Sequence, residues 1–155
     1  MTATAPITKR QIRLAQLSPA YWRVTIDNPP INVMGPEMLQ QFQEVIEALE
    51  ADELVRVVVF DSAVDDYFLN HSDFTAKLED LTALPSGPTG LPPWPDFLVR
   101  LTRLPVASIA LIRGRATGNG SEITLSCDMS FASREKAILS QWEVGVGMVA
   151  GGGPM

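Results

Sequence analysis

The fold is decided by one stretch, Val106–Asp128, with the sequence VASIALIRGRATGNGSEITLSCD. Its first part, Val106–Ile112, is a continuous apolar run, which is typical of a buried strand flanked on both faces. Gly114–Gly120 predicts a glycine-containing turn, and Ser121–Cys127 predicts a short helix. A strand that enters a helix through such a turn presents backbone N–H groups at the helix start, where they suit an anion. A tight connection that binds nothing fits these residues equally well.

The segments before this stretch predict a hairpin, a helix and another strand. Gln11–Leu17 and Tyr21–Ile26 show partial alternation and predict a β-hairpin. From Glu37 onward, apolar residues at intervals of three and four predict an amphipathic helix. Arg56–Asp61 (RVVVFD) predicts a second buried strand, followed by a loop over residues 65–71. The apolar positions of the helix are Met38, Leu39, Phe42, Val45, Ile46 and Leu49.

The remaining segments continue the alternation of strands and helices. Residues 81–95 are rich in proline and glycine and predict a mobile surface loop. Phe97–Leu104 predicts a helix that Pro105 closes, and Met129–Ala132 and Ala137–Leu139 predict further strands. Such an alternation favours the α/β class.

Composition and charge exclude several functional classes. The 155 residues suffice for one domain, and the formal net charge of -6 argues against non-specific nucleic-acid binding. No apolar run is long enough to cross a bilayer, and the first residues do not resemble a secretory signal. The single cysteine, Cys127, cannot form an internal disulfide, and the one histidine, His71, adds little toward a metal site. We therefore expect a cytoplasmic protein without metal, membrane or nucleic-acid partners.

Two glutamates and one histidine are the candidate acid–base residues. Glu122 and Glu143 lie among apolar neighbours, where carboxylates serve as proton donors or acceptors. On the residues alone, the opposite interpretation, two separately solvated glutamates, is favoured. His71 suits acid–base chemistry near neutral pH, or is a loop residue hydrogen-bonded to the backbone. Asp73 before Phe74 is a possible helix cap.

Five blocks of the sequence resemble motifs of the crotonase superfamily, in the same order. They are Asp27–Met34 (DNPPINVM), Arg56–Asp61, Phe68–Phe74 (FLNHSDF), Gly114–Asp128 and Gln141–Gly153 (QWEVGVGMVAGGG). The third block occupies the place of F-x-A-G-x-D-L, and the fourth is similar to G-x-A-x-G-G-G-x-E-L-x-x-x-C-D. The resemblance implies a crotonase-like (ββα) superhelix and one core domain over residues 1–155, with a flexible leader at 1–10. It also implies that the C-terminal helical part, which mediates homo-trimer or hexamer assembly in the family, is absent from this chain.

The resemblance also implies a reaction and the residues that perform it. Family members bind an acyl-CoA thioester, in which coenzyme A is part of the substrate, without a further cofactor. Two backbone N–H groups stabilise the enolate, and by block position they belong to Ser72 and Asn119. The two glutamates of the family's hydratases fall on Glu122 and Glu143, so the implied reaction is addition of water to a 2-enoyl-CoA. The residues implied along the substrate path are Ile31, Asp73, Phe74 and Trp142.

Four residues depart from the family pattern and indicate a narrowed or re-purposed pocket, one of them being Ala150 in place of a proline of the fifth block. His71 replaces the glycine before the first oxyanion donor, Asn119 replaces the middle glycine of the fourth block, and Trp142 replaces a proline. Two alternatives to hydration therefore stay open. One is another enolate reaction on the same scaffold, such as C–C bond hydrolysis or isomerisation in which His71 takes part. The other is a non-catalytic acyl-CoA-binding member.

Overall fold

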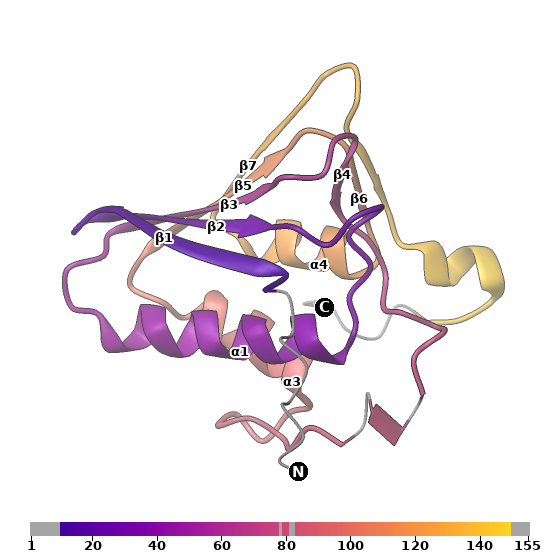
Figure 1. Cartoon of the computed structure of the whole chain (residues 1–155), viewed down its shortest axis with the longest axis horizontal. Helices are drawn as coiled ribbons and strands as arrows, with labels where there is room; N and C mark the ends of the chain where they lie inside the picture. Colours follow the sequence, from indigo (N-terminus) through magenta and orange to yellow (C-terminus); the bar gives the residue numbers. More distant parts are fainter. Residues whose placement is uncertain (1–9, 78, 81–82, 150–155) are drawn as a thin grey trace, which may run out of the picture.

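Strands and helices alternate along the described part of the chain, which comprises residues 10–77, 79–80 and 83–149 of a computed structural model (Figure 1). This arrangement confirms the α/β class. The larger sheet contains β1 (Ile12–Ser18), β2 (Tyr21–Ile26), β3 (Val57–Ser62), β5 (Ala107–Ile112) and β7 (Met129–Ala132). Its strand order is β1-β2-β3-β5-β7, in which β1 and β2 form the predicted antiparallel hairpin and the other pairs are parallel.

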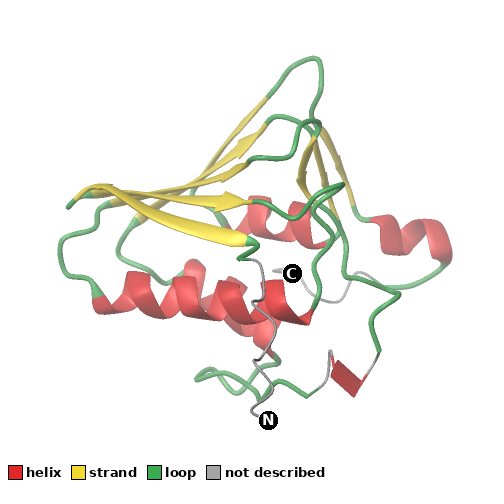
Figure 2. Ribbon diagram, viewed as in Figure 1, coloured by secondary structure: helices red, strands yellow, loops and turns green. Residues whose placement is uncertain are grey.

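A layer of helices covers one face of this sheet (Figure 2). The layer contains α1 (Pro36–Ala51), α3 (Pro93–Leu101) and α4 (Asn119–Ser126). All six apolar positions predicted for the first helix are buried in α1, which confirms that prediction. The core between sheet and helices is rich in phenylalanine, since the ring of Phe97 lies 5.0 Å from that of Phe42 and 6.4 Å from that of Phe60.

A second, smaller sheet corrects two of the sequence predictions. It consists of the parallel strands β4 (Tyr67–Leu69), β6 (Arg115–Thr117) and β8 (Ile138–Ser140). The loop predicted over residues 65–71 therefore contains a strand, and so does the turn predicted over Gly114–Gly120. Three-residue strands are too short to show a period, and these pair only with distant segments. At Gly114 the chains approach so closely that a Cβ atom would lie 2.0 Å from the backbone carbon of Asp66.

The helix α3 begins earlier than the sequence predicts. The predicted helix was Phe97–Leu104, whereas α3 begins at Pro93 and ends at Leu101. The prolines of this segment were interpreted as loop residues, but a proline in the first turn of a helix gives up no intrahelical hydrogen bond. Residues 81–82 of the predicted mobile loop lie outside the described residues, so its mobility stays a prediction.

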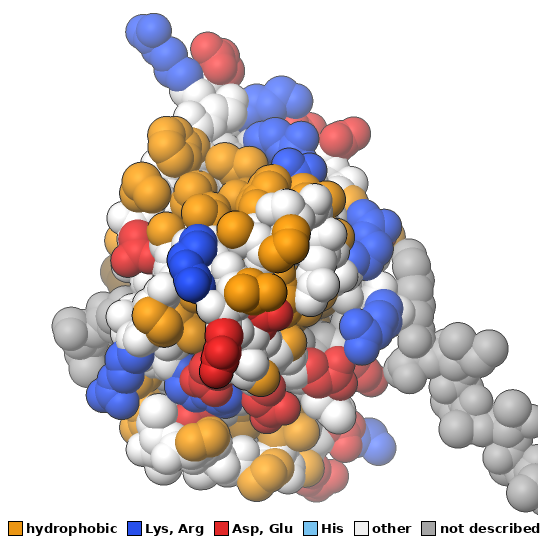
Figure 3. Space-filling view, turned by 90° about the vertical axis from the view of Figure 1, so that its left-hand side faces the viewer, with side chains coloured by type: hydrophobic (Ala, Val, Ile, Leu, Met, Phe, Trp, Pro, Cys, Tyr) orange, Lys and Arg blue, Asp and Glu red, His pale blue; other side chains and the backbone are white. Residues whose placement is uncertain are grey.

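Apolar side chains are exposed along β7, β8 and the outer face of α4. All residues of β7 and β8 are exposed, and each strand lies at the edge of its sheet. Figure 3 views the molecule from the side that lies on the left in Figure 1. Hydrophobic side chains gather in the upper part of this view. The predicted leader falls almost entirely on residues 1–9, outside the described part. The large exposed apolar side chains of these elements are Leu125, Met129, Phe131, Ile138 and Leu139.

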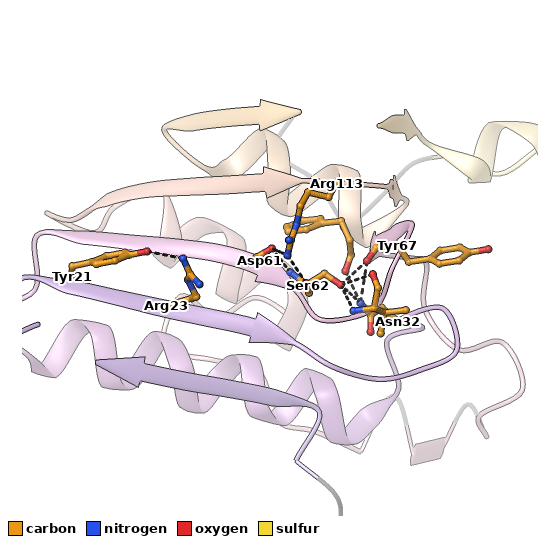
Figure 4. A network of polar contacts seen from close by, with 9 residues as sticks. Tyr21, Arg23, Asn32, Asp61, Ser62, Tyr67 and Arg113 are labelled. Atoms are coloured by element: carbon orange, nitrogen blue, oxygen red, sulfur yellow. Dashed lines mark hydrogen bonds and ion pairs between the residues drawn. The ribbon is translucent and has the colours of Figure 1, made fainter. Parts of the chain in front are cut away.

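A buried asparagine connects the two sheets (Figure 4). The side-chain amide of Asn32 donates hydrogen bonds to Ser62 Oγ at 2.9 Å and to the carbonyl of Phe68 at 2.8 Å. Asn32 is fully buried and has a positive φ of 52°, which asparagine tolerates better than most residues. These bonds attach the loop after β2 to the end of β3 and to β4. They thereby fix where the chain emerges from β4 toward Ser72.

Candidate active site

One pocket collects most of the predicted site residues. Its volume is about 400 Å³, and it lies between the start of α1, the start of α3, the segment after β4, α4 and the 3₁₀ helix η1 (Trp142–Val146). A larger cavity of about 710 Å³ at the C-terminal ends of α1 and α3 contains none of the predicted site residues. The smaller pocket is lined by Met34, Leu39, Ser72, Phe74, Pro92, Pro93, Trp94, Pro95, Asn119, Glu122, Trp142, Glu143, Met148 and Val149.

Glu122 is the buried carboxylate of this pocket. It lies in the first turn of α4, and only 1% of it is exposed. Its Oε2 atom accepts a hydrogen bond of 2.6 Å from the indole N–H of Trp94 and a longer one of 3.4 Å from the amide of Asn119. Donors of this kind are what a buried carboxylate requires, because its hydration has been removed. The structure thus holds Glu122 inside the protein with its side chain facing the pocket.

Ser72 and Asn119 lie together at the same pocket. The Ser72 hydroxyl donates a hydrogen bond of 3.0 Å to the side-chain oxygen of Asn119. The bridge between Met34 and Ser72 uses the carbonyl of His71 and the N–H of Asp73, so the N–H of Ser72 is not part of it. Asn119 is the first residue of α4, where backbone N–H groups have no acceptor within the helix. Both Ser72 and Asn119 line the pocket. The role of their backbone N–H groups as oxyanion donors stays a prediction.

Glu143 reaches the pocket from η1, on the opposite side from α3. It is half-buried, and its Oε2 atom is enclosed without a hydrogen-bond partner among the described residues. Glu122 and Glu143 therefore line one pocket, although 21 positions separate them in the sequence (143 − 122). The interpretation of two separately solvated glutamates does not describe this arrangement.

Three rings pack together beside the pocket. The centroid of Trp142 lies 4.6 Å from that of Phe74 and 5.2 Å from that of His71, and His71 and Phe74 are also 5.2 Å apart. Gly118, with φ +55°, allows this packing, because a Cβ atom there would lie 2.9 Å from the Trp142 ring. We call His71, Phe74 and Trp142 the aromatic cluster. Phe74 and Trp142 line the pocket, whereas His71 is outside the described lining, and the predicted contacts of Phe74 and Trp142 with substrate stay predictions.

Three predicted residues are absent from the described pocket lining. His71 has its Nδ1 atom 2.8 Å from the carbonyl oxygen of Ser72, and Ile31 contributes its carbonyl to a hydrogen bond from Asn70. The Asp73 carboxylate accepts hydrogen bonds from the hydroxyl and the N–H of Thr75, which lower its pKa. Asp73 thus caps the turn at residues 74–75 and not a helix, since no described helix begins at Phe74. The structure does not bring these side chains to the carboxylates, and their predicted roles stay predictions.

A family model described as enoyl-CoA hydratase/isomerase matches residues 19–155. The chain belongs to this family. It is 31% identical to a short-chain-enoyl-CoA hydratase of Clostridium acetobutylicum over 131 residues, covering 84% of the chain and 49% of that protein. An ethylmalonyl-CoA decarboxylase of Danio rerio is 29% identical, over 84% of the chain and 43% of that protein. The chain spans about half the length of the curated relatives it matches.

A solved structure confirms the crotonase fold of this enoyl-CoA hydratase/isomerase family member. A provisionally named enoyl-CoA hydratase from Streptomyces avermitilis superimposes with a TM-score of 0.83 at 33% sequence identity. The match covers 92% of this chain and 53% of that one. The reaction type common to these relatives is crotonase-like chemistry on acyl-CoA thioesters.

Sequence reasoning missed Trp94, which lines the pocket and contacts Glu122 in this family member. The segment was interpreted as a mobile loop, so its side chains were not considered. Trp94 and Phe97 are both apolar and lie three residues apart, a spacing that fits one face of a helix. This spacing could have extended the predicted helix back to Trp94.

Three further features bear on function: the thiol of Cys127, possible metal-binding clusters and possible membrane-spanning helices. Cys127 is outside the described pocket lining, and burial raises the pKa of its thiol to about 12. No group of three His, Cys, Asp or Glu residues that could hold a metal occurs among residues 10–77, 79–80 and 83–149. In the same residues, no helix is both long and apolar enough to span a membrane.

Proposed function

We propose that the protein adds water to the double bond of a 2-enoyl-CoA thioester. The observation that carries the proposal is that Glu122 and Glu143 line one pocket together with Ser72 and Asn119. Relatives named as hydratases support it. Coenzyme A would be part of the substrate, and two carboxylates and backbone donors need no further cofactor for this reaction.

In the proposed mechanism the two glutamates divide the proton transfers. Water is held between them, and Glu122 accepts one of its protons while the oxygen adds to the β-carbon. The electrons of the double bond move toward the thioester oxygen, where the N–H groups of Ser72 and Asn119 stabilise the enolate. Glu143 then delivers a proton to the α-carbon, and the proton on Glu122 returns to Glu143 through solvent. The product is a 3-hydroxyacyl-CoA.

The surroundings of each glutamate suit its proposed role. The Trp94 indole N–H donates a hydrogen bond to Glu122 Oε2, so Glu122 meets Trp94 as an acceptor. A group that acts as a base must likewise be able to accept a proton. The Oε2 atom of Glu143 accepts no hydrogen bond from the described residues, so a water or a substrate carbon can meet it directly. The apolar and aromatic lining fits an uncharged acyl group. A cytoplasmic location, which the composition favours, is part of the proposal. So is assembly as a homo-trimer or hexamer when the C-terminal helices are present, which the family resemblance implies.

Hydration of crotonyl-CoA, followed by loss of the enoyl-thioester absorbance, tests the proposal on the native protein. We expect Glu122→Gln and Glu143→Gln each to lower kcat by about 10²–10⁴-fold, the range for loss of a general acid or base. The matched control is Glu47→Gln, which makes the same change on the exposed face of α1 and should retain activity. Full activity in either pocket variant would contradict the two-carboxylate mechanism. Thioester binding without turnover in the wild type would favour a non-catalytic acyl-CoA-binding member.

A further inference from the structure

The hydrogen bond between Trp94 and Glu122 joins two buried side chains from different helices. The indole Nε1 of Trp94 lies 2.6 Å from Glu122 Oε2, and the two residues are only 6% and 1% exposed. An indole N–H donates and cannot accept, so this bond fixes which atom of the carboxylate faces α3. Asn119 contacts the same oxygen from within α4 at 3.4 Å. The Oε2 atom of Glu122 is therefore held by donors from two segments.

The indole of Trp94 is itself packed between two other rings. It stacks on Phe97 with ring centroids 5.3 Å apart and an angle of 17°, and it meets the edge of Phe42 at 5.4 Å. Pro93 and Pro95 flank it in the first turn of α3, and each proline fixes its own φ. The position of the donor is thus set by packing rather than by the hydrogen bond that it makes.

The helix that carries Trp94 is in turn anchored to α1. Asp96 is fully buried and accepts two hydrogen bonds from Thr89, at 3.0 Å and 2.7 Å. Arg100 donates to Asp96 at 3.2 Å, and its Nε donates to Glu50 of α1 at 2.9 Å. The buried charges of Asp96 and Arg100 are thus paired, and the ion pair of Arg100 with the partly exposed Glu50 joins α3 to α1.

The geometry points to Trp94 as a positioning residue, which holds the Glu122 carboxylate in the orientation that the hydration reaction needs. The inference rests on the proposed function and adds a residue to it. Trp94 does not exchange a proton with the substrate, and it acts through Glu122. A displacement of about 1 Å of a catalytic group costs roughly 100-fold in rate, so a donor that prevents such a displacement is a measurable part of the site.

Trp94→Phe removes the N–H and leaves an aromatic ring between Phe42 and Phe97. We expect kcat for crotonyl-CoA hydration to fall by about 10–100-fold while KM stays within about twofold, because orientation of the glutamate is lost and substrate binding is not. The matched control is Trp22→Phe, since Trp22 is also buried but its Nε1 atom has no partner among the described residues. That variant should keep the wild-type kcat.

A double-mutant cycle with Glu122→Gln separates positioning from a general structural role. If Trp94 acts through Glu122, adding Trp94→Phe to Glu122→Gln should lower kcat by less than about twofold further. The indole ¹H–¹⁵N signal of Trp94 supplies a second measurement on the wild-type ring, and it should shift in Glu122→Gln while that of Trp22 does not.

The possible outcomes distinguish this inference from the proposed function. An active wild type with unchanged kcat in Trp94→Phe overturns the inference and leaves the proposed function standing. Multiplicative effects in the cycle, or an indole signal that ignores Glu122→Gln, also overturn it. A wild-type protein that does not hydrate crotonyl-CoA overturns the proposed function and this inference together.

Discussion

The two glutamates of the pocket stand on walls of very different construction. The inner wall consists of α3 and α4, and its glutamate, Glu122, is almost completely buried. The outer wall is η1, in which Val144 and Val146 are 71% and 56% exposed and the glutamate, Glu143, is half-buried. The inner wall is held by close backbone contacts and hydrogen bonds. The outer wall is held by the aromatic cluster.

This difference matches what each glutamate would do in the proposed reaction. A base that must hold a water in one place benefits from rigid surroundings, and the inner wall supplies them. A proton donor that must meet both a water and the α-carbon needs some freedom, and the short 3₁₀ helix has few contacts to restrict it. The comparison therefore predicts that added bulk disturbs folding far more in the inner wall than in the outer wall, and that loss of an aromatic-cluster ring from the outer wall lowers activity more than stability.

The largest effect is expected for Gly120→Ala in the inner wall. A Cβ atom at Gly120 would lie 1.8 Å from the carbonyl oxygen of Leu69, a backbone atom that cannot move without displacing β4 from α4. We expect a loss of about 3 kcal/mol or more in the free energy of unfolding, at the upper end for overpacking. Urea unfolding followed by circular dichroism measures it.

The control for this prediction is the same change in the outer wall. A Cβ atom at Gly145 in η1 would meet nothing within 4 Å, so Gly145→Ala should change the free energy of unfolding by less than about 0.5 kcal/mol. Equal losses in the two variants would show that the walls do not differ in packing.

An intermediate effect, on activity, is expected for Trp142→Ala in the outer wall. The change removes two ring contacts, each worth about 0.5–1.5 kcal/mol, from the residue that precedes Glu143 in the chain, so we expect Glu143 to be held less firmly. We expect kcat/KM for crotonyl-CoA to fall at least about tenfold, while the free energy of unfolding falls by no more than about 3 kcal/mol.

Phe131→Ala supplies the comparison for Trp142→Ala. Phe131 is an exposed ring on β7, outside the described pocket lining, and its loss should leave kcat/KM unchanged. A Trp142→Ala variant with wild-type kcat/KM would show that the aromatic cluster does not position Glu143.

The contrast between the walls also explains what the sequence could predict. The hairpin and α1 were predictable because their apolar residues recur at strand or helix spacing, and the parallel strands β3 and β5 because each is a continuous apolar run. The pocket residues Ser72, Asn119, Glu122 and Glu143 were found through the order of the family blocks. Trp94 was not, because prolines on both sides of it conceal the first turn of α3, and no local pattern shows that its indole reaches Glu122.

Two of the three strands of the second sheet, β4 and β6, were missed for a related physical reason. The strands β4, β6 and β8 are only three residues long, and each is stabilised by pairing with a segment far away in the chain. The residues of β4 and β6 alone therefore carry no signal, whereas the strand predicted over Ala137–Leu139 falls on β8. Packing of the aromatic cluster is equally non-local, since His71, Phe74 and Trp142 come from two segments about 70 positions apart.

The smallest effect is expected at the far end of the inner wall, where Ser108 joins β5 to the residue after α4. The Asp128 carboxylate accepts hydrogen bonds of 2.8 Å from the N–H and from the hydroxyl of Ser108, and these bonds lower the pKa of Asp128 below the ordinary value of an aspartate. Ser108→Ala removes the hydroxyl and should cost about 1 kcal/mol at pH 7. Because Asp128 has a lower pKa in the folded protein, its contribution is present above the unfolded pKa and is lost as the pH falls through the folded pKa.

The pH dependence of that cost is what tests its cause. The difference in free energy of unfolding between the wild type and Ser108→Ala should be constant from pH 7 to pH 5 and should shrink below about pH 4. Ser130→Ala is the control, because the Ser130 hydroxyl donates to the carbonyl of Thr124, which does not titrate, and its cost should not change with pH. A Ser108→Ala cost that persists undiminished at pH 3 would mean that the hydroxyl stabilises this end of the inner wall by packing and by the hydrogen bond it accepts from the Asp128 N–H, and not through the charge of Asp128.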